Sequence, residues 1–190
     1  MQMNTMIPFP EIDSSWTLFL DRDGVINHQK ENGYINTPSE FEFYEGVKET
    51  ITACSLHFGK IIVVTNQRGV GKGVTTIENL ELIHQKMSAD IKAAGGRIDG
   101  IYYCIDISND SPNRKPNTGM AFQAKADFPE INFSKSIMIG NSLSDLQFGK
   151  KTGMLTVFLT TTNAEPDEAI IKNADLIMDK LKSLSGMLKS

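Results

Sequence analysis

The sequence predicts an α/β fold built on a mainly parallel sheet. Short apolar runs of strand length, such as residues 16–20 and 61–64, alternate along the chain with stretches of helical periodicity. The run 61–64 (Ile-Ile-Val-Val) is uninterrupted and β-branched, which is typical of a parallel strand buried on both faces. The chain has 190 residues, 40% of them hydrophobic and 22% charged. That length and composition suit a globular domain with a substantial core.

Turn and cap residues delimit six strands and the helices between them. The predicted strands comprise residues 16–20, 61–64, 101–105, 136–139, 155–159 and 176–178. The predicted helices comprise residues 47–56, the stretch between Thr75 and Gly95, residues 120–128, a short helix ending at 152, and residues 165–171 and 181–188. Helices alternating with strands in this way indicate a parallel sheet covered by helices.

Each element follows from local signals. Turn dipeptides within residues 24–45 predict an extended flap rather than a long helix. Thr75 with Glu78 three residues later forms a capping-box pattern for the longest helix, whose apolar residues recur at helical spacing. His84 in this helix reads as a helix-face residue rather than a ligand. Three glycines within residues 65–73 predict a loop that could present backbone N–H groups to an anion.

Composition excludes several classes of protein. The net charge is −4, and no basic run suggests nucleic-acid binding. No apolar run approaches the length of a membrane span. Residues 1–15 contain two prolines and lack the pattern of a secretory signal, so residues 1–14 read as a loose lead-in to a single domain over 15–190. Cys54 and Cys104 are the two cysteines, too few for a disulfide framework, and we expect a cytoplasmic protein.

Two carboxylates end the first strand. Asp21 and Asp23 follow the apolar run 16–20, with Gly24 after them and Arg22 as the nearest basic partner. Carboxyl ends of parallel strands carry ligands, so both side chains should stand at the rim of the sheet. Crowded carboxylates favour opposite protonation states unless a cation lies between them, and a divalent oxygen-binding ion, magnesium, would resolve that conflict. The alternative is an acidic turn that merely closes the strand.

The second strand also ends in polar residues. Thr65 and Asn66 precede the glycine-containing loop, and Thr65 is a candidate phosphate contact. The loop is not a P-loop, because that pattern needs Gly where Asn66 stands and Ser or Thr where Gly73 stands. The alternative is a flexible glycine loop without a ligand.

Two later strands complete the set of polar ends. Pro116 forbids helix at Lys115, which leaves this lysine in a loop, free to point into a cleft and meet a phosphate. The alternative is that Arg114 and Lys115 are a solvated surface pair. The fourth strand is followed by Asn141 and Asp145, which again place oxygen ligands after a buried strand.

The four strand ends, taken in this order, resemble the haloacid dehalogenase superfamily of phosphohydrolases. Within it, the chain is similar to the group of D-glycero-D-manno-heptose 1,7-bisphosphate phosphatases and histidinol-phosphatases. The similarity spans residues from about 16 to about 160, in the stretches 21–27, 33–35, 41–47, 63–69, 99–104 and 114–120. This resemblance implies a Rossmann-like three-layer fold without a large cap domain, so the flap after Gly24 and the loop before Arg114 must shape the cleft.

The resemblance also implies catalytic roles. Asp21 would attack phosphorus and form an aspartyl-phosphate, and Asp23 would protonate the leaving alcohol and then activate water. Thr65 and the backbone of Asn66 would hold phosphoryl oxygens. Lys115 would neutralise charge on the phosphoryl group and on Asp21.

The remaining implied roles concern metal and substrate. Magnesium would lie between the Asp21 side chain, the Asp23 backbone carbonyl and the motif that contains Asn141 and Asp145. Arg114 resembles the residue of the family that faces the substrate, and it could bind a second phosphate.

Two departures from the family pattern bear on function. The family usually has Asp where this chain has Asn141, so we expect weaker metal binding, with Asp145 compensating directly or through water. Many relatives also carry a zinc loop of Cys-x-His followed by Cys-x-Cys. Here Cys104 remains, but the other positions hold Asp106, Ser111 and Asn113, so no structural zinc is expected.

The sequence therefore predicts a magnesium-dependent phosphatase that acts as a monomer on a small-molecule phosphate monoester. A heptose bisphosphate of carbohydrate metabolism is the expected substrate. Histidinol phosphate is one alternative. A DNA 3′-phosphatase is another, because residues 114–120 also resemble the phosphatase half of polynucleotide kinase phosphatases, although the net negative charge counts against it. A catalytically impaired phosphate-binding protein is the alternative that Asn141 suggests.

Overall fold

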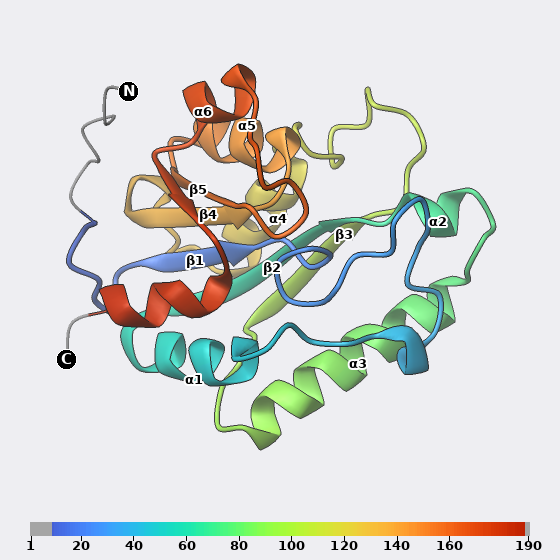
Figure 1. The fold of residues 1–190 in the computed structure, drawn as a ribbon, viewed down its shortest axis with the longest axis horizontal. Helices are drawn as coiled ribbons and strands as arrows, with labels where there is room; N and C mark the ends of the chain where they lie inside the picture. The colour runs from blue at the N-terminus through green and yellow to red at the C-terminus, as the bar shows by residue number, and fades with distance from the viewer. Residues whose placement is uncertain (1–8, 189–190) are drawn as a thin grey trace.

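The computed structural model describes residues 9–188, and its centre is a six-stranded sheet (Figure 1). The strands are β1 (Thr17–Leu20), β2 (Lys60–Asn66), β3 (Gly100–Cys104), β4 (Ser136–Gly140), β5 (Leu155–Leu159) and β6 (Leu176–Met178). They lie in the order β3-β2-β1-β4-β5-β6, and every neighbouring pair is parallel. The predicted α/β fold with a parallel sheet is confirmed.

The order of the strands places the functional edge of the sheet. The chain builds outward from β1 through β2 to β3, and then returns across β1 to add β4, β5 and β6. Leu20, the last residue of β1, is therefore in register with Val63 on one side and Ile139 on the other. The strand order reverses between β1 and β4, and in open α/β sheets the crevice at the carboxyl ends of such a pair is where ligands bind.

Helices cover both faces of the sheet. They are α1 (Val47–His57), α2 (Arg68–Gly71), α3 (Ile77–Ala93), α4 (Gly119–Asp127), α5 (Leu143–Thr152) and α6 (Glu168–Asn173), with short 3₁₀ helices η1 (Pro38–Glu40), η2 (Phe133–Lys135) and η3 (Leu181–Met187). Figure 1 shows α1 and α3 on one side of the sheet and α4, α5 and α6 on the other. The result is the expected three-layer arrangement.

Alternation along β1 divides the core between the two faces. Leu18 and Leu20 belong to the cluster that packs on α1, α3 and η3, whereas Phe19 belongs to the cluster under α4 and α5. All three side chains are fully buried, and burying each contributes about 1.5–3 kcal/mol to stability. Because both faces are covered, β1 must be apolar throughout, and a polar residue can first appear where the strand ends, at Asp21.

The segment between β1 and α1 is the predicted flap. Tyr44 N donates to Ile26 O and His28 N donates to Glu42 O, so the two ends of the flap lie against each other. Ile35 and Phe41 anchor it in the core. Among the described residues of this segment, the regular structure consists of η1 and two isolated bridges, so no separate cap domain is inserted here.

Several expectations were wrong in detail. Residues 68–71 form the short helix α2 rather than a continuous loop. The cap of α3 is Thr76, whose hydroxyl accepts from Asn79 N at 3.2 Å, because Thr75 instead donates its hydroxyl to Asn36 O. Residues 181–187 are a 3₁₀ helix, and α6 begins at residue 168 rather than 165.

The lead-in expected over residues 1–14 is only partly described, since residues 1–8 lie outside the described range. Its described part is not loose, because Phe9 and Ile12 pack against the main core. No helix within residues 9–188 is long and apolar enough to cross a membrane.

Candidate active site

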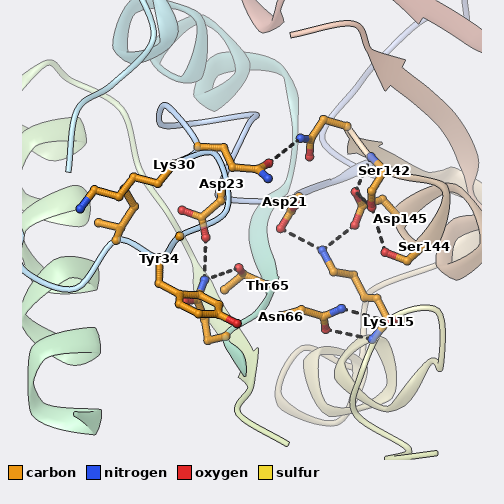
Figure 2. A pocket seen from close by; sticks show the side chains of 15 residues that line it. Asp21, Asp23, Lys30, Tyr34, Thr65, Asn66, Lys115, Ser142, Ser144 and Asp145 are labelled. Carbon is orange, nitrogen blue, oxygen red and sulfur yellow. Dashed lines mark hydrogen bonds and ion pairs between the residues drawn. The ribbon is translucent and has the colours of Figure 1, made fainter. Parts of the chain in front are cut away.

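A pocket of about 210 Å³ opens at the carboxyl ends of β1, β2 and β4 (Figure 2). It is lined by Asp21, Asp23, Gln29, Lys30, Gly33, Tyr34, Ile35, Thr65, Asn66, Gln67, Lys115, Asn141, Ser142, Ser144 and Asp145. The strand-end residues predicted from four separate motifs therefore meet in one place. Pockets for drug-sized ligands typically measure about 300–1,000 Å³, so this one suits a phosphoryl group and the adjoining part of a small molecule.

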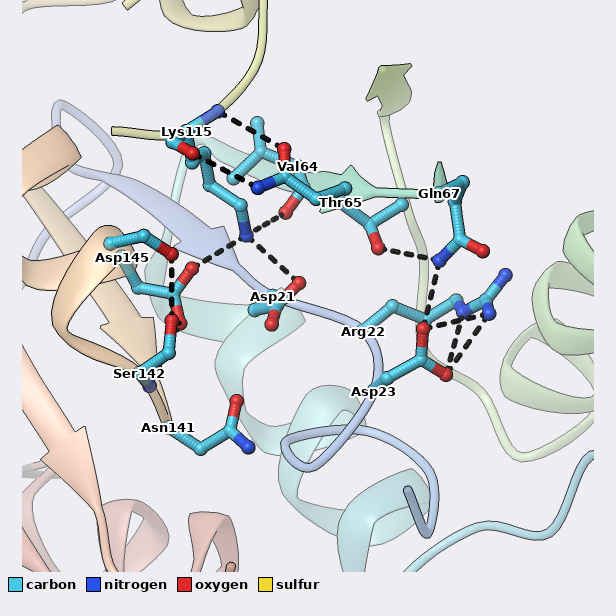
Figure 3. A network of polar contacts seen from close by, with 12 residues as sticks. Asp21, Arg22, Asp23, Val64, Thr65, Gln67, Lys115, Asn141, Ser142 and Asp145 are labelled. Atoms are coloured by element: carbon cyan, nitrogen blue, oxygen red, sulfur yellow. Dashed lines mark hydrogen bonds and ion pairs between the residues drawn. The ribbon is translucent and has the colours of Figure 1, made fainter. Parts of the chain in front are cut away.

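One side of the pocket holds a buried lysine between two carboxylates. Lys115 Nζ lies 2.9 Å from Asp21 Oδ1 and 2.6 Å from Asp145 Oδ1, and it donates to Val64 O at 2.8 Å (Figure 3). The lysine backbone is fixed in turn by Asn66, whose side chain accepts from Lys115 N and donates to Lys115 O. The surface-pair alternative for Lys115 is thereby excluded, since its side chain is 1% exposed.

Burial dominates the protonation of Asp21. Loss of solvent, helped by the nearby charges of Asp145 and Asp23, raises the pKa of Asp21 to about 7, against the opposing effect of the Lys115 ammonium. Two carboxylates and one ammonium leave a net charge of −1 in this cluster. A divalent cation beside Asp21 would more than offset that charge and would favour the ionised form of this carboxylate, the form that can act as a nucleophile.

Asp23 lies in different surroundings, on the side of the pocket toward β2 and α3. Two nitrogens of Arg22 face this carboxylate: Nη2 lies 2.8 Å from Oδ2 and 3.0 Å from Oδ1, and Nε lies 3.3 Å from Oδ1. Asn27 Nδ2 donates to Oδ1 at 2.9 Å, and Gln67 Nε2 donates to Oδ2 at 2.8 Å. Burial would raise the pKa of Asp23, but Arg22 and these two amides together lower it below its usual value.

The last two residues of β2 supply hydrogen-bond donors. The Thr65 hydroxyl accepts from Gln67 Nε2 at 2.8 Å, which leaves its own proton free to donate into the pocket. The Asn66 side chain is occupied by Lys115, so the backbone of Asn66 is the part that can face a phosphoryl group.

Asn141 follows β4 and faces Asp21 across the crevice. Its Nδ2 donates to Thr162 Oγ1 at 2.8 Å and to Gln29 Oε1 at 3.1 Å, which directs the carbonyl oxygen Oδ1 away from those partners. A Cβ at Gly24 would lie 2.1 Å from Asn141 Nδ2, and Gly24 has a φ of +86°. The glycine is needed both for its left-handed backbone and for the room that the asparagine takes.

These residues fit a magnesium ion of modest affinity. Asp21 and Asn141 offer hard oxygen donors from adjacent strand ends, while Asp145 is engaged by Lys115 and by Ser142, whose N and Oγ donate to its Oδ2 at 3.0 and 2.6 Å. Within residues 9–188, no group of three or more His, Cys, Asp or Glu side chains could hold a metal ion. Magnesium in proteins usually keeps several water ligands and is coordinated by one or two carboxylates plus substrate phosphate. The oxygen donors present here match that coordination pattern.

Comparison with known proteins decides the family. The HAD-hydrolase-like family model matches residues 112–184. The D-glycero-beta-D-manno-heptose-1,7-bisphosphate 7-phosphatase of Vibrio cholerae is 31% identical over 179 residues, which cover 90% of this chain and 95% of that protein. The chain is a phosphatase of the haloacid dehalogenase superfamily. It belongs to the same family as that enzyme.

Other relatives agree. The D-glycero-alpha-D-manno-heptose-1,7-bisphosphate 7-phosphatase of Burkholderia mallei is 35% identical over 150 residues, covering 75% of this chain and 78% of that protein. The fold resembles the crystal structure of D,D-heptose 1,7-bisphosphate phosphatase from B. bronchiseptica complexed with magnesium and phosphate, with a TM-score of 0.78 and 24% identity over 90% of this chain and 96% of that one. The corresponding enzyme from Burkholderia thailandensis gives a TM-score of 0.62 at 27% identity, with 90% and 96% covered.

The loop before α4 holds the positions that the family resemblance marks for zinc ligands. Three of them form a small hydrogen-bonded cluster, in which Cys104 Sγ lies 3.6 Å from Asp106 Oδ2 and the Ser111 hydroxyl donates to the same carboxylate. Arg114, expected to contact substrate, does not line the pocket. It is half-buried, and its Nη1 reaches Asp106 O at 3.5 Å.

Sequence reasoning missed several residues of the site. Gln67 and Asn27 hold Asp23, Gln29 holds Asn141, and Tyr34 from the flap lines the pocket. Gln67 and Asn27 lie inside the motifs that carried the resemblance, so their positions could have suggested a role. Gln29 and Tyr34 lie in an extended loop, where no local pattern indicates which side chains turn toward the pocket.

Proposed function

We propose that this phosphatase hydrolyses a small sugar bisphosphate, a heptose 1,7-bisphosphate, with magnesium and through a covalent aspartyl-phosphate. The observation that carries the proposal is the buried triad of Asp21, Lys115 and Asp145 at the base of the pocket, beside the Asn141 amide. Identities of 31–35% to enzymes named for heptose 1,7-bisphosphate support the substrate class.

In the first step, a carboxylate oxygen of Asp21 attacks phosphorus. The bond from phosphorus to the alcohol oxygen breaks, its electron pair stays on that oxygen, and Asp23 delivers the proton that makes the leaving group neutral. Asp23 is ionised in the empty pocket. The arriving phosphate dianion favours protonation of Asp23, because a nearby like charge raises the pKa of a carboxyl group.

In the second step, Asp23 takes a proton from a water molecule whose oxygen attacks the same phosphorus. The bond between phosphorus and the Asp21 oxygen breaks, inorganic phosphate forms, and the Asp21 carboxylate is restored. During both steps the Thr65 hydroxyl, the Asn66 backbone N–H and the Lys115 ammonium stabilise negative charge on the phosphoryl oxygens. Bound magnesium would be held by Asp21, the Asp23 carbonyl and Asn141, and would add a further positive charge at that group.

The second phosphate of the substrate would bind outside the small pocket. Arg114 is the residue proposed to receive it. Burial and the positive charge of Arg68 lower the pKa of Arg114, and a bound anion would relieve the repulsion between these two guanidinium groups. We further propose that residues 15–190 act as one domain, as a monomer, in the cytoplasm, where the free thiols of Cys54 and Cys104 would stay reduced.

A second candidate is a phosphate-binding protein with impaired turnover. It is favoured by one observation, the neutral amide of Asn141 where the family usually has a carboxylate. An uncharged ligand lowers the affinity for magnesium, and loss of the metal would leave binding without rapid chemistry.

Phosphate release tests both candidates. The panel should contain heptose 1,7-bisphosphate of each anomer, other sugar phosphates, histidinol phosphate and 3′-phosphorylated DNA, each with magnesium and with a chelator. We expect magnesium-dependent release from the heptose bisphosphate that disappears in Asp21→Asn. If the native protein is silent on the whole panel while Asn141→Asp is active, the binding-protein candidate replaces the enzyme.

A further inference from the structure

A buried histidine on α3 contacts the arginine that stands between the two aspartates. His84 Nε2 lies 3.1 Å from Arg22 Nη1, and the two residues are 62 positions apart in the chain. Arg22 is fully buried, and His84 is 6% exposed. His84 does not line the pocket, and the mechanism above assigns it no part.

Chemistry fixes the direction of this hydrogen bond. A guanidinium group can only donate, so His84 Nε2 must accept, and the imidazole is neutral with its proton on Nδ1. The surroundings agree, because burial and the adjacent charge of Arg22 lower the pKa of His84 to about 3. The neutral imidazole therefore keeps Nε2 as a hydrogen-bond acceptor.

This acceptor holds one edge of the guanidinium group while Asp23 occupies another. Nη1 is directed to His84, and Nη2 and Nε are directed to the Asp23 carboxylate at 2.8–3.3 Å. The guanidinium group is a planar fork of N–H donors. Held at two edges, this fork cannot rotate in its own plane without losing one of the two contacts. The fork therefore sets the plane and direction in which Asp23 presents its oxygens to the pocket (Figure 3).

We propose that His84 is a positioning residue for the reaction, which acts through Arg22 to orient the Asp23 carboxylate for proton transfer. The proposal rests on the proposed function, because it needs Asp23 to act as acid and base. It adds a residue from a different element, α3, that does not line the pocket.

A purely structural role is the competing explanation. His84 packs against the ring of Tyr103, with centroids 5.5 Å apart, as a core aromatic residue would. The two explanations differ in what the loss of His84 should do. Misplacing an acid slows only those reactions that need one, whereas a general loosening of the site slows all of them.

The test compares leaving groups in single-turnover experiments that follow the release of the alcohol. A sugar or alkyl phosphate needs protonation of its leaving oxygen, whereas 2,4-dinitrophenyl phosphate does not. We expect His84→Leu to slow release from the alkyl phosphate about tenfold and to change release from the dinitrophenyl ester less than about twofold. His84→Gln restores an acceptor near the same place, and should bring the alkyl rate back to within about threefold of the wild type.

Met87→Ala is the matched control, because Met87 is fully buried on the same helix and belongs to the apolar core cluster. It should lower thermal stability without changing the ratio of the two rates. If His84→Leu does not fold, Arg22→Lys, which keeps the charge and loses the fork, should show the same selective loss.

Equal slowing of both substrates, or a Gln variant no better than the Leu variant, would overturn the positioning role while leaving the proposed function intact. A wild-type protein that cleaves neither ester would overturn both.

Discussion

The two halves of the pocket treat chemically identical groups in opposite ways. Asp21 shares one ammonium with a second carboxylate, Asp145, and its pKa is raised to about 7. Asp23, two residues later, accepts hydrogen bonds from Arg22 and from two amides with no second carboxylate beside Arg22, and its pKa is lowered. A spacing of two residues after a strand is enough to direct neighbouring carboxylates into separate polar networks. The half with excess negative charge is suited to a metal and a nucleophile, and the balanced half is suited to an acid that must stay in place.

Removing the ammonium group that Asp21 and Asp145 share should have the largest effect on stability and activity. Lys115→Met leaves Asp21 and Asp145 buried without a counter-charge, which should cost about 3 kcal/mol of stability and lower kcat roughly 10³-fold. Urea unfolding and phosphate release measure the two effects. Lys135→Met, at a lysine that donates to the exposed Ser15, should change neither. Activity within tenfold of the wild type would contradict the assigned role of Lys115.

Removing the charge of Asp23 should disrupt the polar network in the second half of the pocket. Asp23→Asn leaves the fully buried Arg22 without its partner and should destabilise the protein by about 2–3 kcal/mol at pH 7. Because the folded-state pKa of Asp23 is lowered, its contribution is present above the unfolded value near 4 and disappears as the pH falls through the folded value. Glu130→Gln is the control, because Glu130 is exposed and its ion pair with Lys60 is screened by solvent, so the stability should stay nearly unchanged.

Removing the charge of Asp21 should have the opposite effect on the free energy of unfolding. Asp21→Asn leaves Lys115 and Asp145 as a balanced pair, and should raise the free energy of unfolding by about 2 kcal/mol at pH 8 in the presence of a chelator. The folded-state pKa of about 7 exceeds the unfolded value, so the wild type loses stability as the pH rises from 4 through 7. The two unfolding curves should therefore converge at pH 4. A variant less stable than the wild type at pH 8 would show that the charge of Asp21 stabilises the folded protein, as the charge of Asp23 does.

Adding a negative charge to the first half of the pocket should strengthen the binding of magnesium there. Asn141→Asp supplies a second carboxylate beside Asp21 and should raise magnesium affinity on the order of tenfold, as calorimetric titration would show. The Thr162 hydroxyl and the Gln29 amide can both reverse to donate to the new carboxylate. Asn173→Asp, on α6 outside the pocket, adds the same net charge and should leave the affinity unchanged. Equal affinities in the wild type and Asn141→Asp would mean that Asn141 is not a ligand.

Much of this site followed from local sequence signals. Apolar runs with β-branched residues fixed the strands to within one or two residues at most ends, and Asp21, Thr65, Lys115 and Asn141 were placed at strand ends or in loops by where those runs stop. The cap of α3 was misplaced by one residue because Thr75 and Thr76 offer the same chemistry. The choice between them depends on Asn36, a residue of the flap that takes the Thr75 proton.

The sequence by itself determined which chemical groups the pocket would contain, because strand ends and turn residues are encoded by their immediate neighbours. Only the tertiary structure decided how those groups are paired. Lys115 is shared by Asp21 and Asp145, Arg22 is held by His84, and Asn141 is turned by Gln29, a residue 112 positions away. Such pairings depend on which elements the sheet and the flap bring together, and no spacing along the chain records that.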